Sequence, residues 1–199
     1  MGCGGLCRGR WGIETMVTLN HSNIHLEIQK YLKEIDAIDF PERRGNNIEY
    51  MLSLKRGKIL KGPYPHVSIF ESSNRIFSDI VILFGIRQIL LNPQIGTIRL
   101  PFDQYEVKLG AENGFDIEAE KGDAKLIGEA FNVARSFFPD KKRKMKAKLA
   151  NENNYDYRIL IFNADAVPDP DYYRKISTKS MIYLPVDWQI GISEIAFIK

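Results

Sequence analysis

Apolar residues recur at two different spacings along the chain, and each spacing predicts a different kind of element. A spacing of three and four residues, which places side chains on one face of a helix, predicts helices over residues 22–36, 73–91 and 136–150. The second of these is apolar on nearly all sides from Ile80 to Phe84, so we expect it to be deeply buried.

Shorter apolar runs, bounded by glycine, proline and other turn residues, predict the strands. The predicted strands cover residues 97–109, 158–163, 181–184 and 192–198, with short strands in 48–60 and a hairpin within 115–133. Residues 171–176 are expected to form a helical turn. Because helices are interspersed with strands and two strands form a hairpin, the order predicts an α/β fold with a mixed central sheet flanked by helices.

The hairpin is the most informative stretch. Gly122 and Asp123 separate two β-prone runs, and a two-residue loop of this kind is typical of a tight hairpin. Residues whose numbers sum to 245 then face each other. Asp116 lies opposite Glu129, and Glu118 shares their face because strand side chains alternate. The other face is apolar and is expected to be buried; it carries Phe115, Ile117, Ala119, Leu126, Gly128 and Ala130.

Three carboxylates on one face repel one another unless a cation lies between them. Asp116, Glu118 and Glu129 supply the hard oxygen ligands that Mg²⁺ or Mn²⁺ prefers, so the hairpin is a candidate metal site. The alternative is an acidic face exposed to water.

Composition narrows the class of protein. The 199 residues suffice for one domain, which we expect over residues 16–199, and the hydrophobic content of 44% is ordinary for a globular chain. No apolar run reaches the roughly 20 residues of a membrane span. The only cysteines are Cys3 and Cys7, so a reduced, cytoplasmic setting is expected. Residues 1–15 are expected to be a disordered leader, or to precede a true start at Met16.

The order of strand, hairpin, helix and strand, with Asp116 in one hairpin strand and Glu129 in the next, resembles the PD-(D/E)XK nuclease superfamily. The resemblance covers residues 104–163 and implies a restriction-endonuclease-like core. It implies that Asp116 and Glu129 bind Mg²⁺, and that a lysine two residues after the glutamate orients or activates the attacking water. Phe131 occupies that position here.

The helix over 136–150 offers replacements for the missing lysine. Lys142 lies on its apolar stripe, four residues after Phe138 and three before Met145, so we expect it to point inwards to the carboxylates. The alternative is that Lys142 reaches water along the surface. The other basic residues of this helix are candidates for binding phosphates: Lys141, Arg143, Lys144, Lys146 and Lys148.

Two further residues are candidates for supporting roles around the site. Glu106-Val107-Lys108 is a rival Glu-x-Lys pattern, and Lys108 is able to reach the site from a neighbouring strand. Glu27 lies beside the apolar stripe of the first helix, where a carboxylate is usually exposed to water.

The expected function is that of a Mg²⁺- or Mn²⁺-dependent nuclease, a hydrolase that cleaves a phosphodiester bond with a metal-activated water. Its partner would be nucleic acid, with DNA favoured over RNA, and no membrane association is expected. A homodimer is compatible with the sequence. One alternative is a nucleic-acid-binding protein that keeps the fold without catalysis, which Phe131 favours. Another is a structural or interaction protein in which the carboxylates pair with neighbouring cations.

Overall fold

The computed structural model describes residues 15–110 and 113–196. Of the expected leader, only Thr15 is among them, and it begins the first strand; residues 1–14 lie outside the described part. No helix in the described ranges is both long enough and apolar enough to cross a bilayer.

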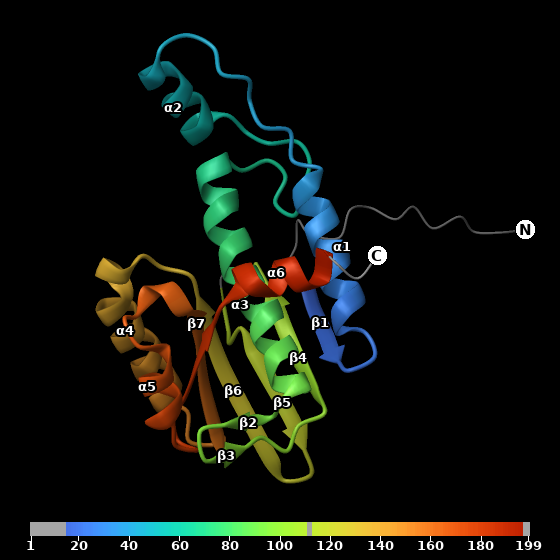
Figure 1. Ribbon diagram of the computed structural model, residues 1–199, viewed down its shortest axis with the longest axis vertical. Helices are drawn as coiled ribbons and strands as arrows, with labels where there is room; N and C mark the ends of the chain where they lie inside the picture. Colours follow the sequence, from blue (N-terminus) through green and yellow to red (C-terminus); the bar gives the residue numbers. More distant parts are fainter. Residues whose placement is uncertain (1–14, 111–112, 197–199) are drawn as a thin grey trace, which may run out of the picture.

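A mixed six-stranded sheet forms the centre of the protein, in the order β1-β4-β5-β6-β7-β8 (Figure 1). Neighbouring strands from β1 to β6 are antiparallel to each other, whereas β7 and β8 run parallel to β6. The strands are β1 (Thr15–Asn20), β4 (Gln104–Leu109), β5 (Ile117–Lys121), β6 (Ala124–Phe131), β7 (Tyr157–Asn163) and β8 (Ile182–Val186). The expected α/β fold with a mixed central sheet is confirmed.

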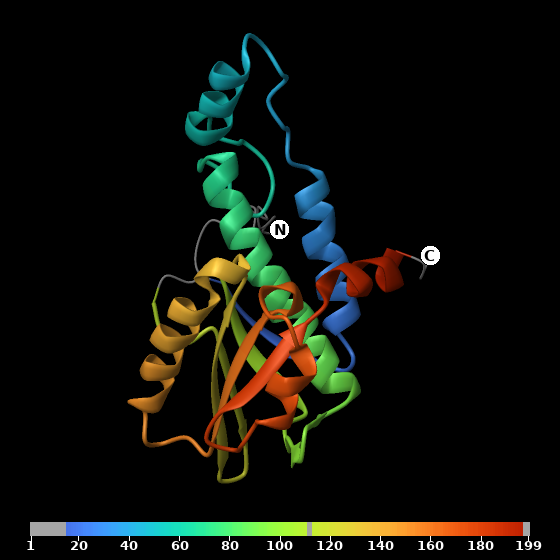
Figure 2. The ribbon, with the colours of Figure 1, turned by 60° about the vertical axis from the view of Figure 1, so that its left-hand side comes forward.

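Helices cover both faces of this sheet. Helix α3 (Ile69–Leu91) packs on one face together with α1 (Ile24–Asp36), and α4 (Phe138–Ala150) packs on the other (Figure 2). The predicted deep burial of α3 is confirmed, because every residue from Asp79 to Ile86 is buried. The remaining helices are α2 (Asn47–Arg56), α5 (Pro170–Lys175) and α6 (Trp188–Ala196).

The register of the β5–β6 hairpin is the predicted one. Ile117 faces Gly128, and the pairing continues to Lys121 opposite Ala124, around a turn at Gly122 whose φ is 61°. Ile117 and Leu126 are fully buried beneath α3, as expected. Phe115 is a correction: it is half-buried and packs with the cluster under α4, because the chain leaves the strand at Asp116 and alternation stops there.

The second face of the hairpin also differs from the expectation. It is not an open acidic surface, because Ile127 and Phe131 alternate with Glu129 and pack against Phe138 and Leu149 of α4. A sheet with parallel strands is normally covered on both faces. Glu129 is therefore buried beneath a helix.

Two elements change type relative to the sequence prediction. Residues 47–56 form helix α2 in place of short strands, and its start is a capping box in which Asn46 and Glu49 bind each other's main chain. Residues 188–196 form helix α6 in place of a late strand. Local apolar runs of this length do not distinguish a strand from a short helix.

Two other boundaries move. Helix α3 begins at Ile69 after Ser68, whose side chain accepts a hydrogen bond from the Glu71 N–H, so it starts four residues before the predicted start. The predicted strand 97–109 is divided into β3 (Ile98–Arg99), which pairs with β2 (Gln94–Ile95), and β4, with Pro101 between them. Proline has no N–H to donate to a strand ladder, which explains the interruption.

Candidate metal-dependent site

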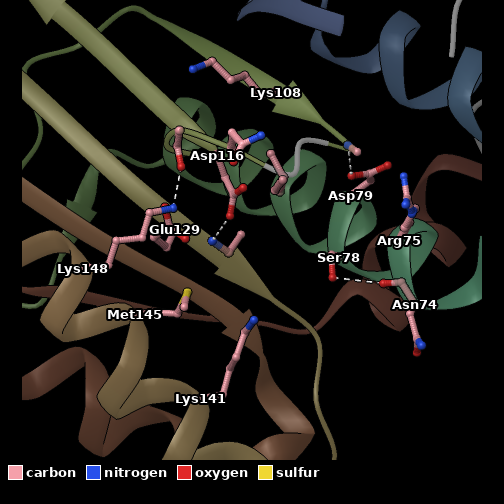
Figure 3. Close-up of a pocket in the computed structure, with 15 residues that line it drawn as sticks. Asn74, Arg75, Ser78, Asp79, Lys108, Asp116, Glu129, Lys141, Met145 and Lys148 are labelled. Carbon is pink, nitrogen blue, oxygen red and sulfur yellow. Dashed lines mark hydrogen bonds and ion pairs between the residues drawn. The ribbon is translucent and has the colours of Figure 1, made fainter. Parts of the chain in front are cut away.

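A pocket of about 380 Å³ opens where β5 and β6 separate, between α3 and α4. Figure 3 shows its side chains arriving from both helices and from the sheet. The strands contribute two carboxylates, Asp116 and Glu129, and three lysines also line the pocket: Lys108, Lys141 and Lys148.

Asp116 lies at the point where the two strands of the hairpin diverge. The regular pairing ends at Ile117 and Gly128. One residue further on, Asp116 Oδ2 accepts a 2.8 Å hydrogen bond from the Ala130 N–H, so a side chain replaces the missing main-chain partner. Asp116 and Glu129 line the same pocket, as the register predicted. They lie one position beyond the last regular pair of the β5–β6 ladder.

Glu129 is the more buried of the two carboxylates, with 4% of its surface exposed. Lys148 Nζ lies 2.6 Å from its Oε1, in an ion pair. The pKa of Glu129 is raised to about 7, first by burial and then by the negative charge of Asp116, against the lowering effect of Lys148. At neutral pH this carboxyl group is thus close to its midpoint of ionisation.

The pKa of Asp116 is also raised, chiefly by burial. The hydrogen bond from Ala130 and the charges of Lys148, Lys141 and Lys108 oppose this effect. The charge of Asp116 raises the cost of ionising Glu129, and two desolvated carboxylates in one pocket are typical of sites that bind a cation or move a proton.

The lysines of α4 are arranged differently from the sequence prediction. Lys142 does not line the pocket: its Nζ lies over the rings of Phe138 and Tyr173, 3.4 Å from the Tyr173 hydroxyl. Lys148 and Lys141 reach the carboxylates instead. The apolar stripe of α4 faces an aromatic cluster, so a lysine on that stripe meets aromatic rings.

Phe131 occupies the position of β6 where the resemblance leads one to expect a lysine. It is 2% exposed and stacks on Phe162 at 6.0 Å between ring centroids, within the cluster under α4. Lys141 Nζ lies 5.9 Å above the Phe131 ring. An ammonium group from the neighbouring helix α4 therefore lies close to this position of the strand.

The remaining candidates, Glu118, Lys108 and Glu27, form ion pairs away from Asp116 and Glu129. Glu118 forms a 3.2 Å ion pair with Lys108 and lines a different pocket, nearer the turn. Lys108 does line the site, but its ammonium group points away from Asp116 and Glu129 (Figure 3) and pairs with Glu118. Glu27 pairs with Lys30 at 2.7 Å on α1.

The remaining basic residues of α4 lie on its outer surface. Arg143, Lys144 and Lys146 are exposed, and Arg143 pairs with Asp140 at 2.8 Å. None of the three lines the pocket that contains Asp116 and Glu129.

Sequence reasoning missed Asp79, which lines the pocket from α3. It is 2% exposed; its Oδ2 accepts hydrogen bonds from the hydroxyl groups of Tyr31 and Tyr64, and its Oδ1 accepts one from the Gly110 N–H. Its pKa is raised to about 6, chiefly by burial. A single carboxylate inside an apolar helix was the signal that sequence reasoning overlooked, since a buried charge requires partners.

The donor set suits a hard divalent cation held by few protein ligands. Within residues 15–110 and 113–196, no three histidine, cysteine or carboxylate side chains converge as a metal cluster. The oxygens of Asp79 are occupied by hydrogen bonds, which leaves Asp116 and Glu129. Mg²⁺ is commonly bound by one or two carboxylates, with water and substrate phosphates completing its shell.

The pocket has features of a cation-binding site and features of a structural ion pair. An accessible pocket with two desolvated carboxylates fits cation binding, whereas the ion pair between Lys148 and Glu129 by itself fits a structural role. No protein-family model matches the sequence, and no curated protein matches it. The function has to be inferred from the geometry of this site.

Proposed function

We propose that the protein is a metal-dependent nucleic-acid phosphodiesterase, an endonuclease with a restriction-endonuclease-like core. The observation that carries the proposal is the pocket at the diverging strands, which Asp116 and Glu129 line together with two lysines from α4. The order β4, β5–β6 hairpin, α4 and β7 supports it, because the resemblance to PD-(D/E)XK nucleases rests on that order.

Asp116 and Glu129 would hold Mg²⁺ or Mn²⁺ through their carboxylate oxygens. The bound ion would supply Lewis-acid chemistry, lowering the pKa of a water ligand and neutralising the phosphoryl oxygens. In its absence, the pKa of Glu129 is about 7, so a cation that binds the ionised form competes with a proton near neutral pH. We therefore expect metal binding to strengthen as the pH rises towards about 7 and to level off above it.

Lys148 and Lys141 take the part of the absent strand lysine. Lys148 Nζ contacts Glu129, and Lys141 also lines the pocket. A positive charge at this distance stabilises the developing negative charge on a phosphoryl oxygen or on an attacking hydroxide. The exposed face of α4, with Arg143, Lys144 and Lys146, would bind the flanking phosphates without reading base sequence.

The test is cleavage of plasmid DNA, linear single-stranded DNA and RNA, each with Mg²⁺, Mn²⁺ or EDTA. We expect cleavage with either metal and none with EDTA. Asp116→Asn should abolish cleavage, whereas Asp103→Asn, an exposed carboxylate that pairs with Lys121, should leave it unchanged. A wild-type protein that cuts none of these substrates with either metal would refute catalysis.

A second candidate is a nucleic-acid-binding protein on the same fold without catalysis. The Lys148–Glu129 ion pair favours it, because this cation already neutralises one of the two candidate metal ligands. In that case, Mn²⁺ should not change the melting temperature of the wild-type protein, and DNA should bind equally well in EDTA. A binding assay beside the cleavage assay distinguishes the two candidates.

A further inference from the structure

Helix α2 and its two connections form an arm that projects from the rest of the protein. In Figures 1 and 2, α2 lies at the end of the molecule farthest from the sheet and adjoins the start of α3. None of its ten residues is buried. An ion pair between Asp39 and Lys61, at 3.2 Å, joins the two connections at the base of the arm.

The outer face of α2 is an apolar stripe. Ile48, Met51 and Leu52, at positions i, i+3 and i+4, are 71%, 60% and 39% exposed. The face towards α3 carries Tyr50 and Leu54, which are half-buried. A helix this short gains most of its stability from packing an apolar face, and here the larger apolar face is left in water. A contiguous exposed patch of this kind marks an interaction surface.

The charges at the two ends of the helix indicate which partner fits. Glu49 stands in the first turn, whereas Lys55 and Arg56 stand in the last. If a second α2 packs antiparallel on the stripe, Glu49 of each copy lies near the basic end of the other. The two helix dipoles are then antiparallel, which is their favourable arrangement. A parallel arrangement would bring the Lys55 and Arg56 side chains of both copies together.

We propose that the stripe formed by Ile48, Met51 and Leu52 is a homodimer interface, in which α2 packs antiparallel on α2 of a second copy about a twofold axis between Met51 and Leu52. Such an interface is self-complementary, since each copy presents the same patch. Two short helices bury less area than a standard interface, so we expect dissociation constants in the micromolar range. The inference does not depend on the proposed nuclease activity.

The first experiment is sedimentation equilibrium of the full chain across the micromolar range, without nucleic acid. We expect a monomer–dimer equilibrium that Met51→Glu weakens by about 100-fold, because each dimer would then bury two charges. Leu91→Glu is the matched control, since Leu91 is 58% exposed at the opposite end of α3. A wild-type protein that remains monomeric at ~0.5 mM, or a Met51→Glu variant that still dimerises as the wild type does, overturns the proposal.

The second experiment tests the antiparallel geometry, in a background with Cys3→Ser and Cys7→Ser. Leu52→Cys lies beside the twofold axis and should form an intermolecular disulfide on mild oxidation. The two copies of Ile48→Cys would lie about 10 Å apart along the helix axes, beyond the roughly 7 Å span of a disulfide, and should not crosslink. Equal crosslinking at both positions would indicate parallel pairing and contradict the proposal.

Other occupants of the stripe give different results. If another part of the same chain covers it, Met51→Glu lowers the melting temperature of a protein that is monomeric throughout. If nucleic acid covers it, Met51→Glu weakens DNA binding while the wild-type protein remains monomeric. Either result overturns the homodimer.

Discussion

The two ends of the β5–β6 hairpin carry the same kind of ion pair in opposite surroundings. At the turn end, Lys125 Nζ lies 2.5 Å from Glu120, and both side chains are about half exposed. At the open end, Lys148 Nζ lies 2.6 Å from Glu129, whose side chain is 5% exposed. The contact distances are nearly equal, but the solvent around the two carboxylates differs.

This difference shows that burial, more than contact distance, sets the chemistry of a carboxylate. Exposed ion pairs contribute little to stability because water screens them. Under α4, burial raises the pKa of Glu129 to about 7 even though a lysine is in contact. At the open end of the hairpin, ionising the buried carboxyl group is therefore costly, and a bound cation would reduce this cost. At the turn end, water already stabilises the carboxylate.

The largest difference between the two ends should appear in cleavage. Glu129→Gln keeps the shape of the side chain but removes the charge of a proposed metal ligand, so we expect single-turnover cleavage with Mg²⁺ to fall by about 10³-fold or more. Glu120→Gln is the matched control at the turn end and should cleave at the wild-type rate. Equal loss in both variants would show that the buried carboxylate has no special role.

The next comparison concerns the lysines. Lys148→Met should lower the single-turnover rate by about 10²-fold at saturating enzyme, because it removes the cation next to Glu129. Lys142→Met should leave the rate unchanged, since Lys142 contacts Tyr173 and lies outside the pocket. The reverse ranking would restore Lys142 to the role that helical spacing predicted for it.

The pH dependence of stability isolates the buried end without metal. Because the folded state raises the pKa of Glu129 from an ordinary 4.5 to about 7, the folded protein binds a proton that the unfolded chain has released. In EDTA, the wild-type free energy of unfolding should therefore fall by about 3 kcal/mol relative to Glu129→Gln as the pH rises from about 4.5 to 7, then level off.

Urea denaturation at several pH values measures this difference. Glu120→Gln should give a curve parallel to that of the wild type. A Glu129→Gln curve that also runs parallel to the wild type would mean that Glu129 ionises normally in the folded protein.

The smallest effect belongs to the turn. Gly122 has a φ of 61°, and an added Cβ would meet no atom within 4 Å, so Gly122→Ala carries only the backbone cost of a left-handed conformation. We expect a loss of about 1 kcal/mol in the free energy of unfolding, seen as a lower melting temperature, with cleavage unchanged. Reduced cleavage would show that the turn and the open end are coupled.

Part of the candidate site followed from the sequence. The Gly122-Asp123 turn fixed the register, and the register placed Asp116 and Glu129 at the same end of the hairpin. The same reasoning failed for Glu118, because sharing a face along a strand does not mean sharing a pocket. It also misplaced Phe115, since strand periodicity does not show where the strand ends.

The lysines and Asp79 were beyond the reach of local patterns. Helical spacing correctly placed Lys142 on the inner stripe of α4, but it gave no information about what that stripe faces. The aromatic cluster occupies the inner face, and Lys148 reaches Glu129 from the flank of the helix. Asp79 joins the pocket from α3, thirty-seven residues before Asp116 in the sequence.

The sequence alone determined the class of fold, most of the helices and strands, and the hairpin register, because these depend on interactions between residues close along the chain. Only the tertiary structure decided that both faces of the sheet are covered, that Glu129 is buried and which lysine meets it. It also decided that the stripe of α2 remains exposed. These properties depend on which elements pack together, and burial by a distant segment leaves no periodic pattern in the residues that are buried.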